Sequence, residues 1–377
     1  MYSKKYSKDQ KINNPEKYSL TKNLIWSSPQ NFNLTMDIYS PKNISERCPV
    51  IVMFHGGGFL IRRKEILNNM AQYIASNHDY VVCNVNYRLL RDQNNTVMFN
   101  DLIGDAFGSI LWIKENIHKY NGDKEKIGIT GDSAGAYICS MITNLGDKIG
   151  KKEDFENTFA FEPTYLPPDK SLNEISEENL LSVKASVLSY GGYNFYKFAL
   201  RGAETYKNIF WWLAFSKPRG VLGKKFNPVD HPEIYKAISP IYNIPDVSQR
   251  KLPPQLLTSA TKDRISPVKM IKQYANALKD KNQEFEYWEH LNRNHAYLDS
   301  GKTIYAGNDF KKDGIPALKV MMKFFEKHLS SLLFVFRAYE INISLIFFPI
   351  IFSFVGIVFE LSTRLYKAPV FLKGVIF

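Results

Sequence analysis

The 377-residue sequence contains only three cysteines, Cys48, Cys83 and Cys139, and their spacing fits no set of metal ligands. Cys83 stands in an apolar run and Cys139 in a segment with helical periodicity, so we expect both to be buried thiols. The cysteine content therefore gives no reason to predict a metal centre.

The N-terminus also lacks the apolar stretch of a secretory signal, which favours a cytoplasmic or membrane-associated protein. The net charge is +12, but outside a lysine-rich start the basic residues are scattered and no basic helix stands out. This distribution argues against nucleic acid as a partner. It predicts a solvated basic surface, with some attraction to anionic membranes. We find no internal repeat, and the oligomeric state stays open.

What the sequence does contain is an alternation of apolar strands and helices. A continuous apolar run, typical of a strand covered on both faces, occurs at 49–54, and further buried strands are predicted at 80–85 and 183–190. Residues 127–130, 254–259 and 284–289 are predicted to supply the other strands. Helical patterns occur at 64–76, 101–120, 134–145 and 315–329. Residues 33–39 alternate as an edge strand would. We predict an α/β fold, a doubly wound and mostly parallel sheet with ligands at the carboxyl ends of its strands.

Two glycine-rich motifs follow two of these strands. Gly131-Asp132-Ser133-Ala134-Gly135 matches G-x-S-x-G, the nucleophile elbow that lifts a serine hydroxyl clear of its backbone. A chain of this length would hold that pattern by chance roughly one time in ten. His55-Gly56-Gly57-Gly58-Phe59 can aim bare backbone N–H groups at an oxyanion. Together, and in this order, they predict acyl transfer with Ser133 as the nucleophile.

A serine nucleophile needs a base within hydrogen-bond reach and an acid to hold that base. Asp263 and His295 each follow a predicted strand, in the order serine, acid, histidine that an α/β-hydrolase uses. His290, at the strand end, is the nearest rival of His295, and Asp246 is a distant competitor of Asp263.

The remaining site predictions concern backbone donors and the acyl pocket. The N–H groups of Gly57, Gly58 and Ala134 would form the oxyanion hole, and His55 would brace the glycine loop. Residues 191–235 are rich in aromatic side chains and lie between two sheet strands, so we predict a lid segment over the acyl pocket rather than extra core. The substrate-binding residues predicted on this basis are Phe59, Phe210, Trp211 and Trp212.

With these residues placed, the chain resembles the hormone-sensitive-lipase-like and bacterial carboxylesterase group of α/β-hydrolases. The landmarks are the segment 34–41, the HGGGF and GDSAG motifs, Asn86-Tyr87-Arg88-Leu89, Ser239-Pro240 and the pair Asp263 and His295. The resemblance covers about residues 33–330. It implies hydrolysis of short-chain esters through an acyl-enzyme, with no metal and no other cofactor.

Two other functions stay open: a peptidase or amidase on the same fold, and a catalytically silent hydrolase that serves as a binding module. The expected organisation is a basic flexible arm (1–22), a catalytic domain (23–330) and a hydrophobic tail (331–377). Residues 341–359 of the tail carry no charge and are long enough for a membrane helix, so we also predict that the tail associates with membrane.

Overall fold

The computed structural model describes residues 11–152, 155, 158–303 and 306–330. The predicted tail, with its apolar stretch 341–359, lies outside these residues. Of the described helices, none combines the length and the apolar character needed to cross a bilayer.

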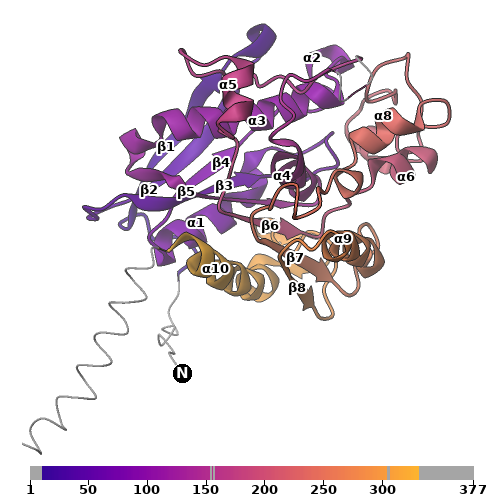
Figure 1. Ribbon diagram of the computed structural model, residues 1–377. Coiled ribbons are helices and arrows are strands. Elements are labelled where there is room, and N and C mark those ends of the chain that lie inside the picture. Colours follow the sequence, from indigo (N-terminus) through magenta and orange to yellow (C-terminus); the bar gives the residue numbers. More distant parts are fainter. Residues whose placement is uncertain (1–10, 153–154, 156–157, 304–305, 331–377) are drawn as a thin grey trace, which may run out of the picture. The chain divides into compact units, whose positions relative to one another are not determined.

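Eight strands form one sheet in the order β1-β2-β4-β3-β5-β6-β7-β8 (Figure 1). They are β1 (Tyr18–Ser27), β2 (Leu34–Pro41), β3 (Cys48–Phe54), β4 (Val81–Val85), β5 (Gly122–Asp132), β6 (Ala185–Ser189), β7 (Gln255–Ala260) and β8 (Phe285–His290). In the sheet order, all neighbouring strands from β4 through β3 to β8 pair in parallel. The pairs β1 with β2 and β2 with β4 are antiparallel. A separate two-stranded ribbon joins β9 (Lys302–Thr303) and β10 (Asn308–Asp309). The predicted doubly wound, mostly parallel sheet is confirmed.

Strand β1 contradicts two of the predictions, the edge position of residues 33–39 and the end of the N-terminal arm. β1 pairs along β2, so the strand that we predicted at the sheet edge is its second strand. Because β1 begins at Tyr18, the predicted boundary of the arm at residue 22 is also wrong. The pairing is irregular between Thr21 and Leu24, where the sequence is polar, and this irregularity hides the alternation that marks a strand.

The helices cover both faces of the sheet. Their bounds are α1 (Asn68–Asn77), α2 (Asp92–Asn95), α3 (Phe99–Asn116), α4 (Ala134–Leu145), α5 (Leu172–Glu177), α6 (Phe195–Leu200), α7 (Ile209–Leu213), α8 (Pro232–Ala237), α9 (Val268–Asp280) and α10 (Ile315–Leu329). In one apolar cluster, α3, α4 and α9 pack with Val50, Val52 and Phe54 of β3. In the other, α1 and α10 pack with Ile51 and Met53 of the same strand. The two-residue period of a strand thus divides β3 between two cores.

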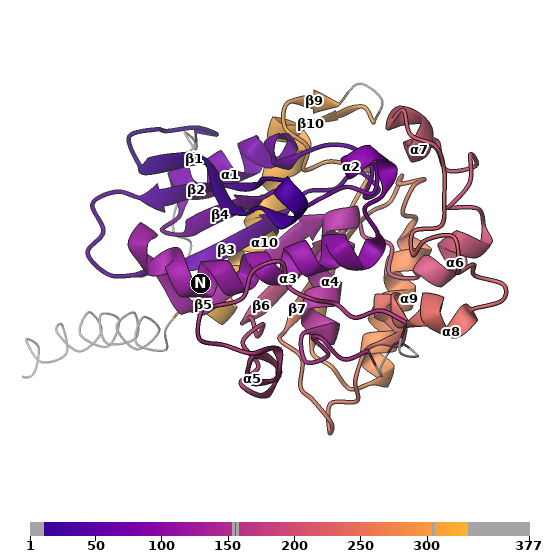
Figure 2. The same cartoon turned by 90° about the horizontal axis from the view of Figure 1, so that it is seen from above.

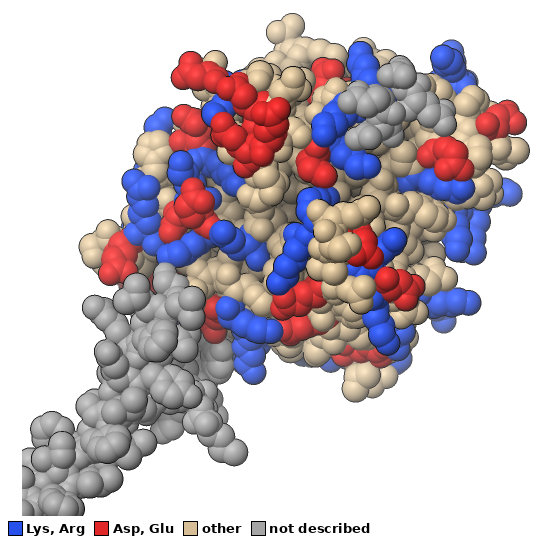
Figure 3. Space-filling view, in the orientation of Figure 1, with Lys and Arg blue, Asp and Glu red and all other residues tan. Residues whose placement is uncertain are grey.

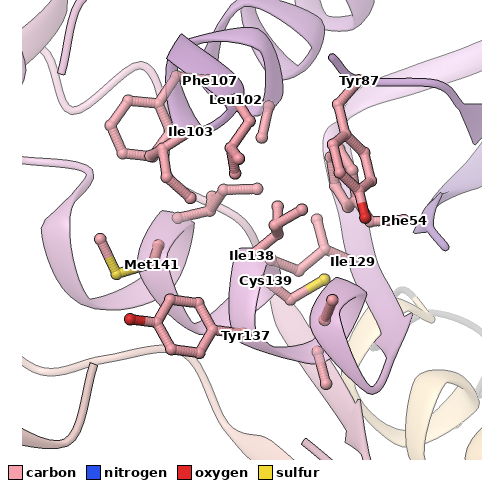
Figure 4. Packing of buried hydrophobic residues seen from close by; sticks show 14 of the residues in the cluster. Phe54, Tyr87, Leu102, Ile103, Phe107, Ile129, Tyr137, Ile138, Cys139 and Met141 are labelled. Carbon is pink, nitrogen blue, oxygen red and sulfur yellow. The ribbon is translucent and has the colours of Figure 1, made fainter. Parts of the chain in front are cut away.

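Figure 4 shows the first of these cores from close by. Leu102, Ile103 and Phe107 of α3 face Ile138 and Met141 of α4. This packing fixes the helix that follows the predicted nucleophile. Cys83 and Cys139 are both buried and unpaired, as predicted, and so is Cys48.

On the opposite face, α10 lies close to the backbone of β5. A Cβ atom added to Gly128 would lie 2.6 Å from the Phe325 ring, so only a glycine permits this approach. The central strand of the sheet therefore rests directly on the last described helix.

The lid segment, 191–235, leaves the sheet after β6, contains α6 and α7 and ends within α8, and these three helices lie together at one side of the sheet (Figure 2). On the face drawn in Figure 3, basic and acidic side chains are interspersed, and neither sign forms a continuous field.

Candidate active site

Ser133 sits at the sharp turn between β5 and α4. Its φ of 52° and ψ of −113° lie outside the regions that residues with a side chain favour. The flanking glycines allow the turn: a Cβ on Gly135 would lie 1.9 Å from the Phe54 carbonyl oxygen, and one on Gly131 would lie 2.3 Å from the Gly135 carbonyl carbon. The two glycines of G-x-S-x-G are therefore required by close backbone contacts.

The turn brings three side chains together in a chain of hydrogen bonds. His295 Nε2 lies 3.0 Å from Ser133 Oγ, and His295 Nδ1 lies 2.7 Å from Asp263 Oδ2. Asp263 and His295 are almost fully buried. The other carboxylate oxygen of Asp263 accepts backbone N–H bonds from Ile265 and Ser266, each 2.8 Å long, which fix the carboxylate beside the imidazole. The three residues picked from the sequence are in contact.

The rival residues lie elsewhere. His290 Nε2 is 2.8 Å from the backbone oxygen of Asp313, and its ring packs against Trp288 and Tyr297. Asp246 accepts hydrogen bonds from the backbone and hydroxyl of Ser248 in its own exposed turn. Neither contacts Ser133.

The glycine loop after β3 faces the same serine. Gly57 and Gly58 have φ values of +117° and +61°, which favour glycine, and a Cβ on Gly57 would lie 2.0 Å from the Ile61 carbonyl oxygen. Within the described part of the chain, no acceptor bonds the backbone N–H of Gly57, Gly58 or Ala134. These are the three donors predicted for the oxyanion hole.

His55 is a structural part of this loop. Its ring stacks on Tyr87 at 4.5 Å, and Tyr87 donates its hydroxyl proton to the His55 carbonyl oxygen at 2.7 Å. Complete burial lowers the pKa of His55 to about 4, so the imidazole is neutral at physiological pH. Its Nδ1 lies 2.7 Å from the Gly56 carbonyl oxygen and donates to it.

Sequence reasoning missed the group that joins the two motifs. Asp132 Oδ1 accepts the backbone N–H of Gly56 at 2.7 Å, so the residue before Ser133 holds the glycine loop. Burial, followed by the nearby charge of Asp299, raises the pKa of Asp132 well above its ordinary value. Tyr190, with a φ of +40°, places its hydroxyl 3.5 Å from Asp132 Oδ2 and its ring edge-on against His295. Asp132 was visible within GDSAG, but its partners are distant in sequence.

A pocket of about 270 Å³ opens beside Ser133. Phe59 and Tyr137 line it from the body, and Phe195, Phe198 and Phe210 line it from the lid segment. Phe210 also lies close to Gly58, where an added Cβ would be 2.8 Å from its ring.

The two neighbouring tryptophans do not line this pocket, contrary to our prediction. Trp211 is fully buried inside the lid segment, and its Nε1 donates to the Ala203 carbonyl oxygen at 2.9 Å. Trp212 is 70% exposed. On a helix as short as α7, successive residues point in different directions, and only Phe210 points into the pocket. Among the described residues, no three His, Cys, Asp or Glu side chains are grouped as metal ligands.

Known proteins share parts of this arrangement. The chain is 27% identical over 118 residues to carboxylesterase NlhH and 28% identical over 156 residues to esterase LipI, both of Mycobacterium tuberculosis. These alignments cover 31% and 39% of this chain, and only 36% and 46% of the relatives. Esterase 2 of Thermogutta terrifontis phosphorylated by paraoxon superimposes with a TM-score of 0.58 at 19% identity, over 84% of this chain and 97% of that one.

The structural neighbour confirms the α/β-hydrolase fold, and the relatives confirm the resemblance to bacterial carboxylesterases. A family model described as BD-FAE matches residues 36–278, well over half of the chain. The match holds both glycine motifs, Ser133 and Asp263, and it ends before His295. By this match the chain belongs to the BD-FAE family.

Proposed function

We propose that the protein is a serine esterase that hydrolyses short-chain carboxylic esters through an acyl-enzyme. The observation that carries the proposal is the chain of hydrogen bonds from Ser133 through His295 to Asp263. The names of the relatives, carboxylesterase and esterase, agree with this reaction.

The chemistry follows from the geometry. As Ser133 Oγ attacks the ester carbonyl carbon, its proton passes to His295 Nε2, and the carbonyl oxygen becomes an oxyanion. Asp263 holds the imidazole so that Nε2 faces the serine, and it stabilises the imidazolium. His295 then returns the proton to the leaving alcohol as the C–O bond breaks. Water, deprotonated by His295, attacks the acyl-enzyme and releases the acid.

The developing negative charge needs donors that are already in place. The free N–H groups of Gly57, Gly58 and Ala134 supply them, and each such donor typically accounts for about 3–4 kcal/mol of transition-state stabilisation. Asp132 acts as a positioning residue because it holds Gly56, the residue just before these donors.

The preference for short acyl groups rests on the pocket. Its volume, about 270 Å³, is below that of pockets for drug-sized ligands, which begin at about 300 Å³. Aromatic rings from the body and the lid segment line it, and they would exclude water from a small acyl chain.

The alternatives differ in what they require. A silent binding module has no need of an aligned nucleophile, base and acid, so the buried hydrogen-bond chain disfavours it. A peptidase or amidase would use the same three residues, and only a substrate comparison separates it from an esterase.

Two measurements test the proposal. A fluorophosphonate probe should label the wild-type protein at Ser133, as located by mass spectrometry, and should leave the folded Ser133→Ala variant unlabelled. Absence of labelling would refute the assignment of the nucleophile. The kcat/KM values for p-nitrophenyl acetate, butyrate and palmitate, and for matched anilides, should be highest for the two short esters. A higher value for the anilides would indicate an amidase, and a higher value for palmitate would refute the short-chain preference.

A further inference from the structure

The lid segment exposes a dense group of large apolar side chains. Phe215 is 95% exposed, Trp212 70%, Tyr206 65%, Ile209 64% and Leu213 51%. Single exposed apolar residues are common on soluble proteins, but five within ten residues mark an interaction surface. We call these five residues the lid ridge.

The backbone holds the ridge outward. Ile209, Trp212 and Leu213 occupy positions i, i+3 and i+4 of α7 and so share one face of this helix. The opposite side is anchored, because Trp211 is buried and the Asn208 side chain accepts the Phe210 N–H at 3.1 Å.

The segment that follows the ridge is tied to the body of the protein. The Arg219 guanidinium donates to the carbonyl oxygens of Asn95 and Leu90, at 2.7 and 2.9 Å. The Asn95 amide donates to the Lys217 carbonyl oxygen at 2.9 Å. Because the inner side of α7 and the segment after the ridge are both held, the ridge cannot turn inward without breaking these hydrogen bonds.

The exposed charges next to the ridge in the sequence have one sign. Between residues 195 and 219 the exposed ionised groups are Lys197, Arg201, Lys207 and Lys217. The single carboxylate in this stretch, Glu204, is turned inward, where it accepts hydrogen bonds from the Tyr235 hydroxyl and the Val221 N–H. Tryptophan and phenylalanine flanked by lysine and arginine are typical of surfaces that lie in a membrane interface, and cations there attract anionic headgroups.

The ridge is also next to the entrance of the active site. Lys207, Asn208 and Phe210 line the pocket beside Ser133, and they alternate in sequence with ridge residues. In Figure 2, α7 lies at the rim of the molecule, apart from the sheet. A surface bound at α7 would therefore lie beside the opening through which an ester enters.

We propose that the lid ridge docks the protein on an anionic lipid surface. Trp212, Phe215 and their neighbours insert at the boundary of headgroups and acyl chains, while the flanking cations contact lipid phosphates and carboxylates. This docking is separate from the predicted membrane association of the tail, and it does not depend on turnover.

Vesicle sedimentation with the full chain tests the proposal. The wild-type protein should bind vesicles of phosphatidylcholine mixed with phosphatidylserine more tightly than vesicles of phosphatidylcholine alone. The double variant Trp212→Ser/Phe215→Ser should lose about a hundredfold in partition coefficient, roughly tenfold for each ring. Lys217→Glu should reduce the preference for anionic vesicles. The matched control is Leu20→Ser/Ile25→Ser, which removes two exposed apolar side chains from β1 and should bind like the wild type.

A local probe separates the ridge from the tail. Since all three native cysteines are buried, a dye attached to Phe215→Cys reports on the ridge, and one attached to Ile25→Cys serves as its control. Anionic vesicles should shift the emission of the first dye to shorter wavelength and leave the second unchanged. Unaltered binding by the double variant, or no shift at residue 215, would overturn the proposal in favour of the tail. A wild-type dimer that dissociates in the double variant, without vesicle binding, would instead identify the ridge as an interface between two copies. Hydrolysis of a water-soluble ester should be the same in all variants, which checks their folding.

Discussion

Replacing Ser133 by glycine should stabilise the protein relative to replacing it by alanine, although both changes should abolish hydrolysis. The reason is the backbone at the elbow, where Ser133 has a φ of 52° and a ψ of −113°. A residue with a Cβ in such a conformation stores about 1–3 kcal/mol of strain, and glycine does not. Both substitutions remove the same hydroxyl and its hydrogen bond with His295, so their difference isolates the backbone.

The expected magnitude is a balance of two terms. Glycine gains freedom in the unfolded chain, which costs about 0.4–1 kcal/mol of stability relative to alanine. The strain that glycine relieves, about 1–3 kcal/mol, exceeds this cost over most of that range. The Ser133→Gly variant should therefore unfold with a free energy about 1 kcal/mol above that of Ser133→Ala, the reverse of the usual order of these residues.

Urea denaturation followed by circular dichroism measures the difference, provided that both variants unfold with the same dependence on urea. Ala277→Gly, within α9, is the control and should lose about 1 kcal/mol relative to the wild type. If Ser133→Gly falls below Ser133→Ala by a similar margin, the elbow stores no strain and the argument fails.

Three further predictions concern the site. Asp263→Asn should lower kcat by about 10⁴-fold with an unchanged fold. His295→Gln should be nearly inactive, whereas His290→Gln should keep its activity within a few fold of the wild type. Equal losses of activity at the two histidines would contradict the geometry. Asp132→Asn, which keeps an acceptor for Gly56, should retain most activity, whereas Asp132→Ala should lose at least tenfold in kcat with little change in KM. The pKa of His55 is about 4 in the folded protein and about 6.5 in the unfolded chain. The unfolded chain therefore binds more protons in this range, and the stability of the protein falls as the pH drops from about 6.5 to 4. The loss should be about 3 kcal/mol, and His55→Phe, compared by urea denaturation at both pH values, should lack this contribution.

Much of the catalytic framework could be predicted because local sequence determines it. Strands β3 and β4 are short and mostly apolar, and in the elbow and the glycine loop an added Cβ would lie within 3 Å of neighbouring atoms at each glycine. The order serine, acid, histidine then left few residues to consider, and Asp263 and His295 are the pair that meets Ser133.

The errors arose where tertiary contacts decide the outcome. Strand β1 is irregular and partly polar, so its position at the edge depends on pairing with β2. The aromatic content of the lid segment could not show that Trp211 points inward and Trp212 outward, because a five-residue helix has no usable periodicity. The bond between Asp132 and Gly56 joins residues 76 positions apart, and nothing in either motif indicates it.

The close contact between α10 and β5 also has a consequence for biosynthesis. The central strand and the elbow leave the ribosome nearly two hundred residues before the helix that covers their other face. Until α10 arrives, α1 is the only helix of this second cluster that can cover the face, and the Gly128 backbone remains exposed in a nascent sheet that is prone to mispairing. His295 is also synthesised late, so the nascent chain carries Ser133, the proposed nucleophile, long before its proposed base. We therefore expect chaperones that bind this half-covered sheet during synthesis to raise the yield of active protein.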